Sequence, residues 1–216
     1  MRNLVLTGFM GTGKTTLGRA AAERLGRPFV DMDDLIETRA GKSIPRIFAE
    51  DGEAVFRDLE SRICEELSER EGWVIATGGG ALIDPHNRAA MSRDATLVCL
   101  QADVDEILQR VGDGTERPML QGDNPRRDVE RLLARRRRAY ASIPWQLSTT
   151  GRSTDELVGE LVRLSAVQSL RVSCPDGHYD IHIGRSIFPY LGGALQAAGV
   201  DMSSRIALVS NDVVAP

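Results

Sequence analysis

Short apolar runs alternate with amphipathic stretches over the first 165 residues of the chain. The apolar runs have the length of strands and lie at Asn3–Leu6, Pro28–Val30, Trp73–Ala76, Thr96–Leu100 and Gln146–Ser148. Between them, apolar positions recur with helical spacing over Lys14–Leu25, Asp34–Ala40, Glu53–Arg70, Val104–Val111, Asp128–Ala141 and Thr154–Ser165. Strands that alternate with helices predict an α/β protein with a parallel sheet covered on both faces.

Two segments depart from this alternation. Residues 112–125 form a polar loop with glycines at both ends and Arg117 in its centre, which suits either a lid over a ligand or a plain surface loop. After residue 166 the pattern starts afresh, with strand-like Leu170–Ser173 and Tyr179–Ile183, helical Ser186–Ala198 and apolar Ile206–Val209. We therefore expect a domain over residues 1–166 and an incomplete α/β tail over residues 167–216. About 50 residues cannot bury a core of their own, so this tail is expected to be mobile or to dock its apolar strands on another surface.

Composition excludes several classes of protein. An apolar fraction of 42% is ordinary for a globular domain, and a net charge of −4 gives no basic field for nucleic acid or for an anionic membrane. No apolar stretch approaches the ~20 residues needed to span a bilayer. The three cysteines are far apart, which argues against disulfides and a zinc ribbon. We expect a cytoplasmic protein that binds a small molecule rather than nucleic acid or membrane.

The segment after the first apolar run carries the most specific motif. Residues 8–15 read Gly-Phe-Met-Gly-Thr-Gly-Lys-Thr and match the pattern G-x-x-x-x-G-K-[ST] at every fixed position, between a strand and a helix. This is a Walker A phosphate loop, in which the backbone amides around Gly11, Thr12 and Gly13 surround a phosphate at the positive end of a helix. Lys14 would bridge the β- and γ-phosphates, and the Thr15 hydroxyl would bind Mg²⁺.

A phosphate loop alone does not distinguish kinases from GTPases or ATPases. The guanine signature N-K-x-D is absent from the sequence, which counts against a GTPase. Asp31 and Asp33 follow the second strand, at the sheet edge where α/β proteins bind ligands. One carboxylate could serve the metal and the other an acceptor hydroxyl; for Asp34, a favourable charge at a helix N-terminus is the rival explanation.

Two further groups are candidates for the second substrate. Arg57 and Glu60 are three residues apart on one predicted helix and share a face, as a site pair or as a surface ion pair. Gly78, Gly79 and Gly80 follow the third strand. Three successive glycines indicate a close approach of the backbone, either to a ligand or to a packed helix.

Taken together, residues 1–165 resemble shikimate kinase. The resemblance rests on six motifs in order, which read G-F-M-G-T-G-K-T-T, D-M-D, F-R-x-x-E, G-G-G, R-P-M-L and R-x-x-x-Y. It implies a P-loop NTPase three-layer sandwich of the nucleoside-monophosphate-kinase-like type, with a five-stranded parallel sheet. It also implies transfer of a phosphoryl group from ATP, with Mg²⁺, to the 3-hydroxyl of shikimate, by a kinase domain that is monomeric.

The resemblance assigns roles residue by residue. Catalysis falls to Asp33, the candidate base on the shikimate hydroxyls, together with Lys14 and Arg117, the lid arginine. The nucleotide would be bound by Gly11, Thr12, Gly13, Lys14, Thr15, Thr16, Arg110 and Arg117, with Arg110 stacking on adenine. Shikimate would contact Asp33, Arg57, Gly78, Gly79, Gly80 and Arg136, with Glu60 supporting Arg57, and the metal would be held by Thr15 and, through its outer shell, by Asp31.

Two parts of the sequence qualify this assignment. The usual R-x-P-L-Y stretch of the family reads Arg-Arg-Arg-Ala-Tyr over residues 136–140, so that Arg135 could replace Arg136 if the helix is rotated. Residues 179–184 and 207–212 resemble the first strands and helix of 3-dehydroquinate synthase, which implies a kinase joined to a truncated synthase start. The motifs for NAD and metal of that second family are absent from the sequence.

Two other functions remain open at this point. One is a related small-molecule kinase that acts on a different hydroxyl, such as that of gluconate. The other is a nucleotide-binding module without catalysis, whose tail would dock a partner. The complete set of Lys14, Thr15, Asp33 and Arg117 favours a kinase over the module.

Overall fold

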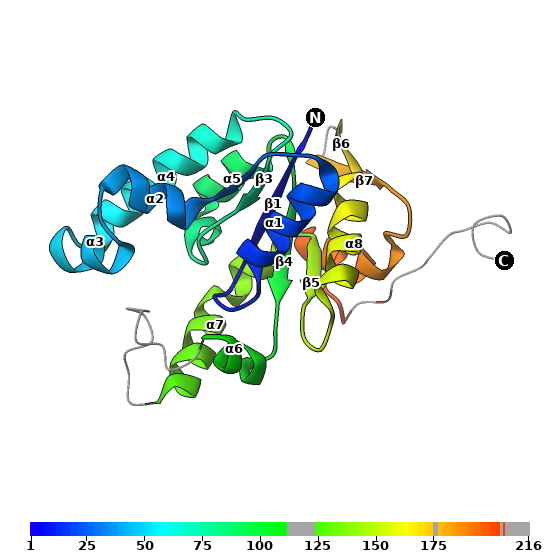
Figure 1. The fold of residues 1–216 in the computed structure, drawn as a ribbon. Helices are drawn as coiled ribbons and strands as arrows, with labels where there is room; N and C mark the ends of the chain where they lie inside the picture. The colour runs from blue at the N-terminus through cyan, green and yellow to red at the C-terminus, as the bar shows by residue number, and fades with distance from the viewer. Residues whose placement is uncertain (112–123, 175–176, 204, 206–216) are drawn as a thin grey trace, which may run out of the picture.

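A computed structural model of the chain describes residues 1–111, 124–174, 177–203 and 205, without the side chain of His178. Its main sheet has five parallel strands in the order β2-β3-β1-β4-β5 (Figure 1). The strands are β1 (Asn3–Gly8), β2 (Phe29–Asp31), β3 (Val74–Ala76), β4 (Ala95–Gln101) and β5 (Trp145–Ser148). The five-stranded parallel sheet predicted from the sequence is confirmed.

Helices cover both faces of this sheet. Along β1 the side chains alternate, so that Val5 enters one apolar cluster while Leu4 and Leu6 enter the other. The first cluster is closed by α2 (Met32–Ala40), α3 (Ile44–Glu50), α4 (Glu53–Ser68), α5 (Pro85–Ser92), α6 (Val104–Val111) and α7 (Pro125–Ala141), the second by α1 (Lys14–Leu25) and α8 (Thr154–Ser165). The result is the expected three-layer sandwich. Within the described ranges, no helix has the length and apolar character needed to cross a membrane.

Three helical elements were not predicted, namely α3, α5 and the 3-10 turn Ala81–Ile83. Both helices are short and begin with a proline in their first turn, which helices accept there because that amide has no partner inside the helix. At α5 the Asp84 carboxylate accepts hydrogen bonds from the amides of His86 and Asn87. Asp84 followed by Pro85 was therefore a readable start signal, whereas α3 is too short for a helical period to show.

The end of β1 can be occupied only by glycine. Gly8 has a φ of +132°, and a Cβ at this position would lie 2.2 Å from the carbonyl oxygen of Leu100 on β4. A side chain here would be strained and would also collide with rigid backbone. Gly8 therefore serves the packing of β1 against β4, while the later glycines of the phosphate loop serve its turn.

The tail contributes an antiparallel hairpin and a short helix. The hairpin pairs β6 (Gln168–Cys174) with β7 (Gly177–Ile183), and it is followed by the 3-10 turn η3 (Phe188–Tyr190) and by α9 (Leu191–Ala197). In Figure 1 these elements lie on the side of β5 and α8. His182 and Tyr190 contact the Trp145 ring edge-on, whereas the apolar Leu170, Tyr179, Ile181 and Ile183 are exposed. The expected apolar run Ile206–Val209 lies outside the described residues.

Candidate active site

The phosphate loop occupies the turn between β1 and α1. Gly11 and Gly13 have φ values of +75° and +89°, a region that favours glycine, and Gly13 is the N-cap of α1. The Thr12 hydroxyl and the Lys14 ammonium both donate to the carbonyl oxygen of Phe9, at 2.7 and 3.0 Å. These bonds close the loop into a ring at the positive end of α1, which is the geometry that binds phosphate.

Thr15 and Asp31, the predicted metal pair, are in contact. The Thr15 hydroxyl donates to Oδ2 of Asp31 at 2.6 Å, while Oδ1 of Asp31 accepts the amide of Asp33 at 2.9 Å and caps α2. Among the described residues, no group of three His, Cys, Asp or Glu side chains could hold a metal by itself. A hydroxyl and one carboxylate fit Mg²⁺, which in kinases takes its other ligands from substrate phosphates and water.

Two residues predicted for the acceptor, Arg57 and Glu60, lie on α4 and line the same cleft as the phosphate loop. Arg57 donates to Oε2 of Glu60 at 2.7 Å and to Glu53 at 3.1 Å, and its guanidinium lies 5.0 Å from the ring centre of Phe56. Glu60 is only 2% exposed, and within the described residues its Oε1 has no hydrogen-bond partner. Burial raises the pKa of Glu60, although the charge of Arg57 opposes this rise.

This raised pKa predicts a specific dependence of stability on pH. A carboxyl group with a higher pKa in the folded state binds its proton more tightly when folded, so its contribution to stability falls as pH increases. We expect the melting temperature of the wild type, relative to Glu60→Gln, to decline from the ordinary glutamate pKa upward through the raised one. Thermal denaturation of both proteins across this range measures the difference. A difference that is constant with pH would contradict the prediction.

The glycines after β3 pass close to charged side chains of the cleft. A Cβ on Gly78 would lie 2.7 Å from Oδ1 of Asp33, and one on Gly80 would lie 2.7 Å from Nη1 of Arg57. On Gly79 it would lie 3.4 Å from Nη1 of Arg136. The triple glycine therefore lets the backbone approach three candidate substrate-binding side chains, which project from α2, α4 and α7.

Arg136 lies on the inner face of α7, one turn before Tyr140. Its Nη1 and the hydroxyl of Tyr140 both donate to the carbonyl oxygen of Gly79, at 3.0 and 2.7 Å. Arg136 is only 6% exposed, whereas Arg135 is exposed on the outer side of the helix. Burial raises the pKa of Tyr140 to about 12, which keeps its hydroxyl protonated as a donor. Of the two arginines that the sequence left open, the structure brings Arg136 to the cleft.

These groups open onto one cleft of about 1120 Å³. It contains every described residue predicted for the site, namely Gly11, Thr12, Gly13, Lys14, Thr15, Thr16, Asp31, Asp33, Arg57, Glu60, Gly78, Gly79, Gly80, Arg110 and Arg136. Arg117, the remaining prediction, lies outside the described residues. The phosphate loop, Arg57 and Arg136 thus line one continuous space.

Residues beyond β5 form a wall of the cleft that sequence reasoning missed. Arg110 on α6 donates to the carbonyl oxygen of Gly11 at 3.1 Å and to the Thr149 hydroxyl at 2.9 Å. Thr149, Arg152 and Thr154 line the cleft beside it. They follow a strand of the parallel sheet, so the rule that selected Asp31 would also have selected Thr149. Phe48 and Phe56, 4.8 Å apart between ring centres, line the cleft as an apolar wall. Phe56 opens the F-R-x-x-E motif, whereas no motif indicated Phe48.

Comparison with known proteins shows the family to which the chain belongs. The sequence model of the family described as Shikimate kinase matches residues 10–165. Shikimate kinase of Geobacter sulfurreducens is 44% identical over 160 residues, which cover 74% of this chain and 88% of the relative. The solved structure of shikimate kinase from Acinetobacter baumannii in complex with shikimate superimposes with a TM-score of 0.73, at 38% identity, over 76% of this chain and 92% of the other. That of shikimate kinase from Aquifex aeolicus gives a TM-score of 0.67 at 34% identity, over 75% and 95% of the two chains. The chain therefore belongs to the shikimate kinase family.

Proposed function

We propose that the protein transfers the γ-phosphoryl group of ATP to the 3-hydroxyl of shikimate. The observation that carries this proposal is that the phosphate loop, Asp33, Arg57 and Arg136 all line the same cleft. Two guanidinium groups in one cleft suit the carboxylate of a compact ring acid, because arginine binds carboxylates through parallel hydrogen bonds. The Acinetobacter baumannii relative, whose structure is described as a complex with shikimate, supports the same acceptor.

The roles of the phosphate-binding residues follow from their positions. Lys14 is the cation at the end of the loop and would neutralise charge on the β- and γ-phosphates. Thr15 and Asp31 would hold Mg²⁺, which when bound supplies charge stabilisation between the phosphates. Arg110 would flank the adenine, and we assign the lid role at the transferring phosphoryl group to Arg117 by resemblance alone. Phosphoryl transfer is accelerated mainly by positioning and by such charges.

On the acceptor side, Asp33 would accept the proton of the attacking hydroxyl. Arg57 and Arg136 would hold the carboxylate at the other end of the ring, and Glu60 orients Arg57 through the 2.7 Å hydrogen bond. The carbonyl oxygen of Gly79, which accepts from both Arg136 and Tyr140, helps to hold the Arg136 guanidinium in position. Fixing both ends of the acceptor aligns its hydroxyl with the nucleotide, which is a main source of rate in this chemistry.

The two adjacent arginines of α7 test this assignment. Replacing Arg136 by methionine is expected to raise KM for shikimate roughly 10- to 100-fold, because a charge-assisted contact with the carboxylate is lost. KM for MgATP should stay within twofold of the wild type. Arg135→Met is the matched control, since the same change at the exposed neighbour should leave both constants unaltered. Steady-state assays of ADP release decide between them, and an equal effect of the two variants would contradict the assignment.

The reaction itself is tested by a coupled assay for ADP release with MgATP and shikimate, gluconate or no acceptor. Turnover with shikimate alone supports the proposed reaction. Turnover with gluconate would favour the related sugar-acid kinase. ADP release that is independent of acceptor, or no release at all, would favour a nucleotide-binding module.

We further propose that residues 1–166 form the kinase unit and that residues 167–216 are the partial start of a 3-dehydroquinate synthase. This second statement is supported by the resemblance of residues 179–184 and 207–212 to that family. We further propose that the protein is cytoplasmic. The unpaired thiols of Cys64, Cys99 and Cys174 are compatible with that reducing compartment.

A further inference from the structure

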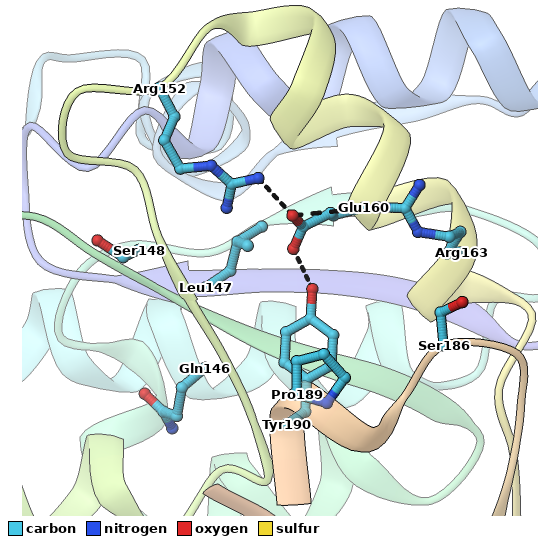
Figure 2. A pocket seen from close by; sticks show the side chains of 9 residues that line it. All are labelled: Gln146, Leu147, Ser148, Arg152, Glu160, Arg163, Ser186, Pro189 and Tyr190. Atoms are coloured by element: carbon cyan, nitrogen blue, oxygen red, sulfur yellow. Dashed lines mark hydrogen bonds and ion pairs between the residues drawn. The ribbon is translucent and has the colours of Figure 1, made fainter. Parts of the chain in front are cut away.

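A second cavity, of about 450 Å³, lies where the tail meets β5 and α8. Figure 2 shows its centre, with Glu160 of α8 between Arg152, Arg163 and the ring of Tyr190 from the tail. None of these four side chains was assigned a role in the kinase reaction. Around this cavity the tail contacts the domain through charged and hydroxyl groups, unlike an ordinary apolar packing contact.

The carboxylate of Glu160 is the centre of this contact. Its Oε2 accepts a hydrogen bond from the hydroxyl of Tyr190, and its Oε1 accepts one from Nη2 of Arg152 (Figure 2). Arg163 is farther from the same oxygen than Arg152 is, with its Nη2 3.9 Å from Oε1. Although burial opposes the charge, the hydrogen bonds from Arg152 and Tyr190 keep the pKa of Glu160 below its usual value. Glu160 is therefore an anion that two arginines can share.

Arg152 belongs to both cavities. It lines the space under the tail, and it also lines the wall of the active-site cleft beside Arg110 and Thr149. Its Nη2 is directed to Glu160, which leaves the other N–H groups of its planar fork for the cleft. A long side chain of this kind loses considerable conformational freedom when it binds a ligand, unless another group already holds it.

The position of Tyr190 is fixed by the folded tail. Its ring lies edge-on to Trp145 of β5, with ring centres 6.0 Å apart, and its amide donates to the carbonyl oxygen of Ile187 at 3.0 Å. Close by, α9 approaches the start of β5 so closely that a Cβ on Gly193 would lie 2.6 Å from the carbonyl oxygen of Pro144. The hydroxyl of Tyr190 thus reaches Glu160 from a defined direction.

We propose that Tyr190 is a positioning residue for nucleotide binding, which acts through Glu160 to hold Arg152 at the cleft wall. The hydroxyl of Tyr190 occupies one carboxylate oxygen and stops the carboxylate from turning, so that the other oxygen stays on Arg152 rather than passing to Arg163. The tail thereby contributes to the kinase site without entering it. This inference rests on the proposed function only in that it places a nucleotide in the cleft between the phosphate loop and Arg110.

Tyr190→Phe in the full chain tests the proposal, because it removes the hydroxyl and keeps the ring against Trp145. We expect the Kd for MgADP, measured by calorimetry, and KM for MgATP to rise roughly 3- to 10-fold, as for the release of one immobilised side chain. KM for shikimate and kcat should stay within twofold. MgADP binding requires no acceptor, so its outcome is separate from that of the shikimate assay.

Three further variants test whether Tyr190 acts on MgADP binding through Glu160 and Arg152. Tyr179→Phe is the matched control, because Tyr179 is the exposed tyrosine of the same tail and should bind MgADP as the wild type does. Glu160→Gln should weaken MgADP binding at least as much as Tyr190→Phe. In an Arg152→Met background, Tyr190→Phe should have no additional effect, as a double-mutant cycle requires of residues that act in series. Unchanged MgADP binding in Tyr190→Phe, or the same loss with and without Arg152, would overturn the proposal.

Discussion

Replacement of Lys14 by methionine is expected to lower kcat about 10³-fold, with little change in stability. The Nζ atom of Lys14 lies 3.0 Å from the carbonyl oxygen of Phe9, at the mouth of the phosphate loop. The chain contains one other lysine, Lys42, which forms ion pairs with Glu50 and Asp51. Methionine keeps the length of the side chain but removes the charge that would meet the negative charge developing on the transferring phosphoryl group. The loss should therefore appear in the chemical step and not in folding.

Lys42 provides the matched control for this experiment. It bridges Glu50 and Asp51, at 3.1 and 2.5 Å, around the short helix α3. Lys42→Met should keep kcat within twofold of the wild type. Rates of ADP release with saturating MgATP and shikimate, together with melting temperatures, separate the two variants. Comparable rates for Lys14→Met and the wild type would contradict the assigned role of the loop lysine.

The second large effect is expected for Asp33→Asn, which should lower kcat about 10³-fold, within the range usual for loss of a general base. Asp33 lies at the carboxyl end of β2, and its amide is fixed by Oδ1 of Asp31 at 2.9 Å. Asparagine can still accept a hydrogen bond from the acceptor hydroxyl but cannot take its proton at neutral pH. KM for MgATP should remain unchanged, because Thr15 and Asp31 are intact.

Asp34→Asn, at the next residue, is the control for Asp33→Asn. Asp34 is exposed on the first turn of α2, where its charge favours the helix dipole. We expect this variant to lose a few tenths of a kcal/mol of stability and no activity. Assays of both variants with shikimate, gluconate and no acceptor show whether the affected step involves the acceptor. Full activity of Asp33→Asn would mean that the proton leaves by another route, which a loose transition state allows.

The architecture could be predicted from the sequence because local patterns decide it. Each strand of the main sheet lies within two residues of its predicted position, since a run of buried apolar residues between turns has few alternatives. The helices α1, α6 and α8 begin and end as predicted, and the capping box of Ser153 and Glu156 forms at the start of α8. The short helix α3 was not predicted, because seven residues are too few for a helical period of 3.6 to be recognised.

The site was predictable in part for a different reason. The phosphate loop needs glycines and a lysine at fixed spacing, so a short run of consecutive residues is enough to recognise it. Arg136 could not be separated from Arg135 by spacing alone. The rotation of α7, set by the packing of Val129 and Tyr140 into the core, turns one arginine to Gly79 and the other to solvent.

The sequence by itself therefore determined the fold class, the phosphate loop and most of the residues around the cleft, because each depends on short-range patterns of size, polarity and backbone freedom. The tertiary structure alone decided which charged groups meet across elements distant in the chain. It set the side chains of Asp33, Arg57 and Arg136 against the three glycines, and it brought Tyr190 of the tail to Glu160. Such contacts depend on how whole helices are rotated and packed, and this information is distributed over the entire core rather than written in any one segment.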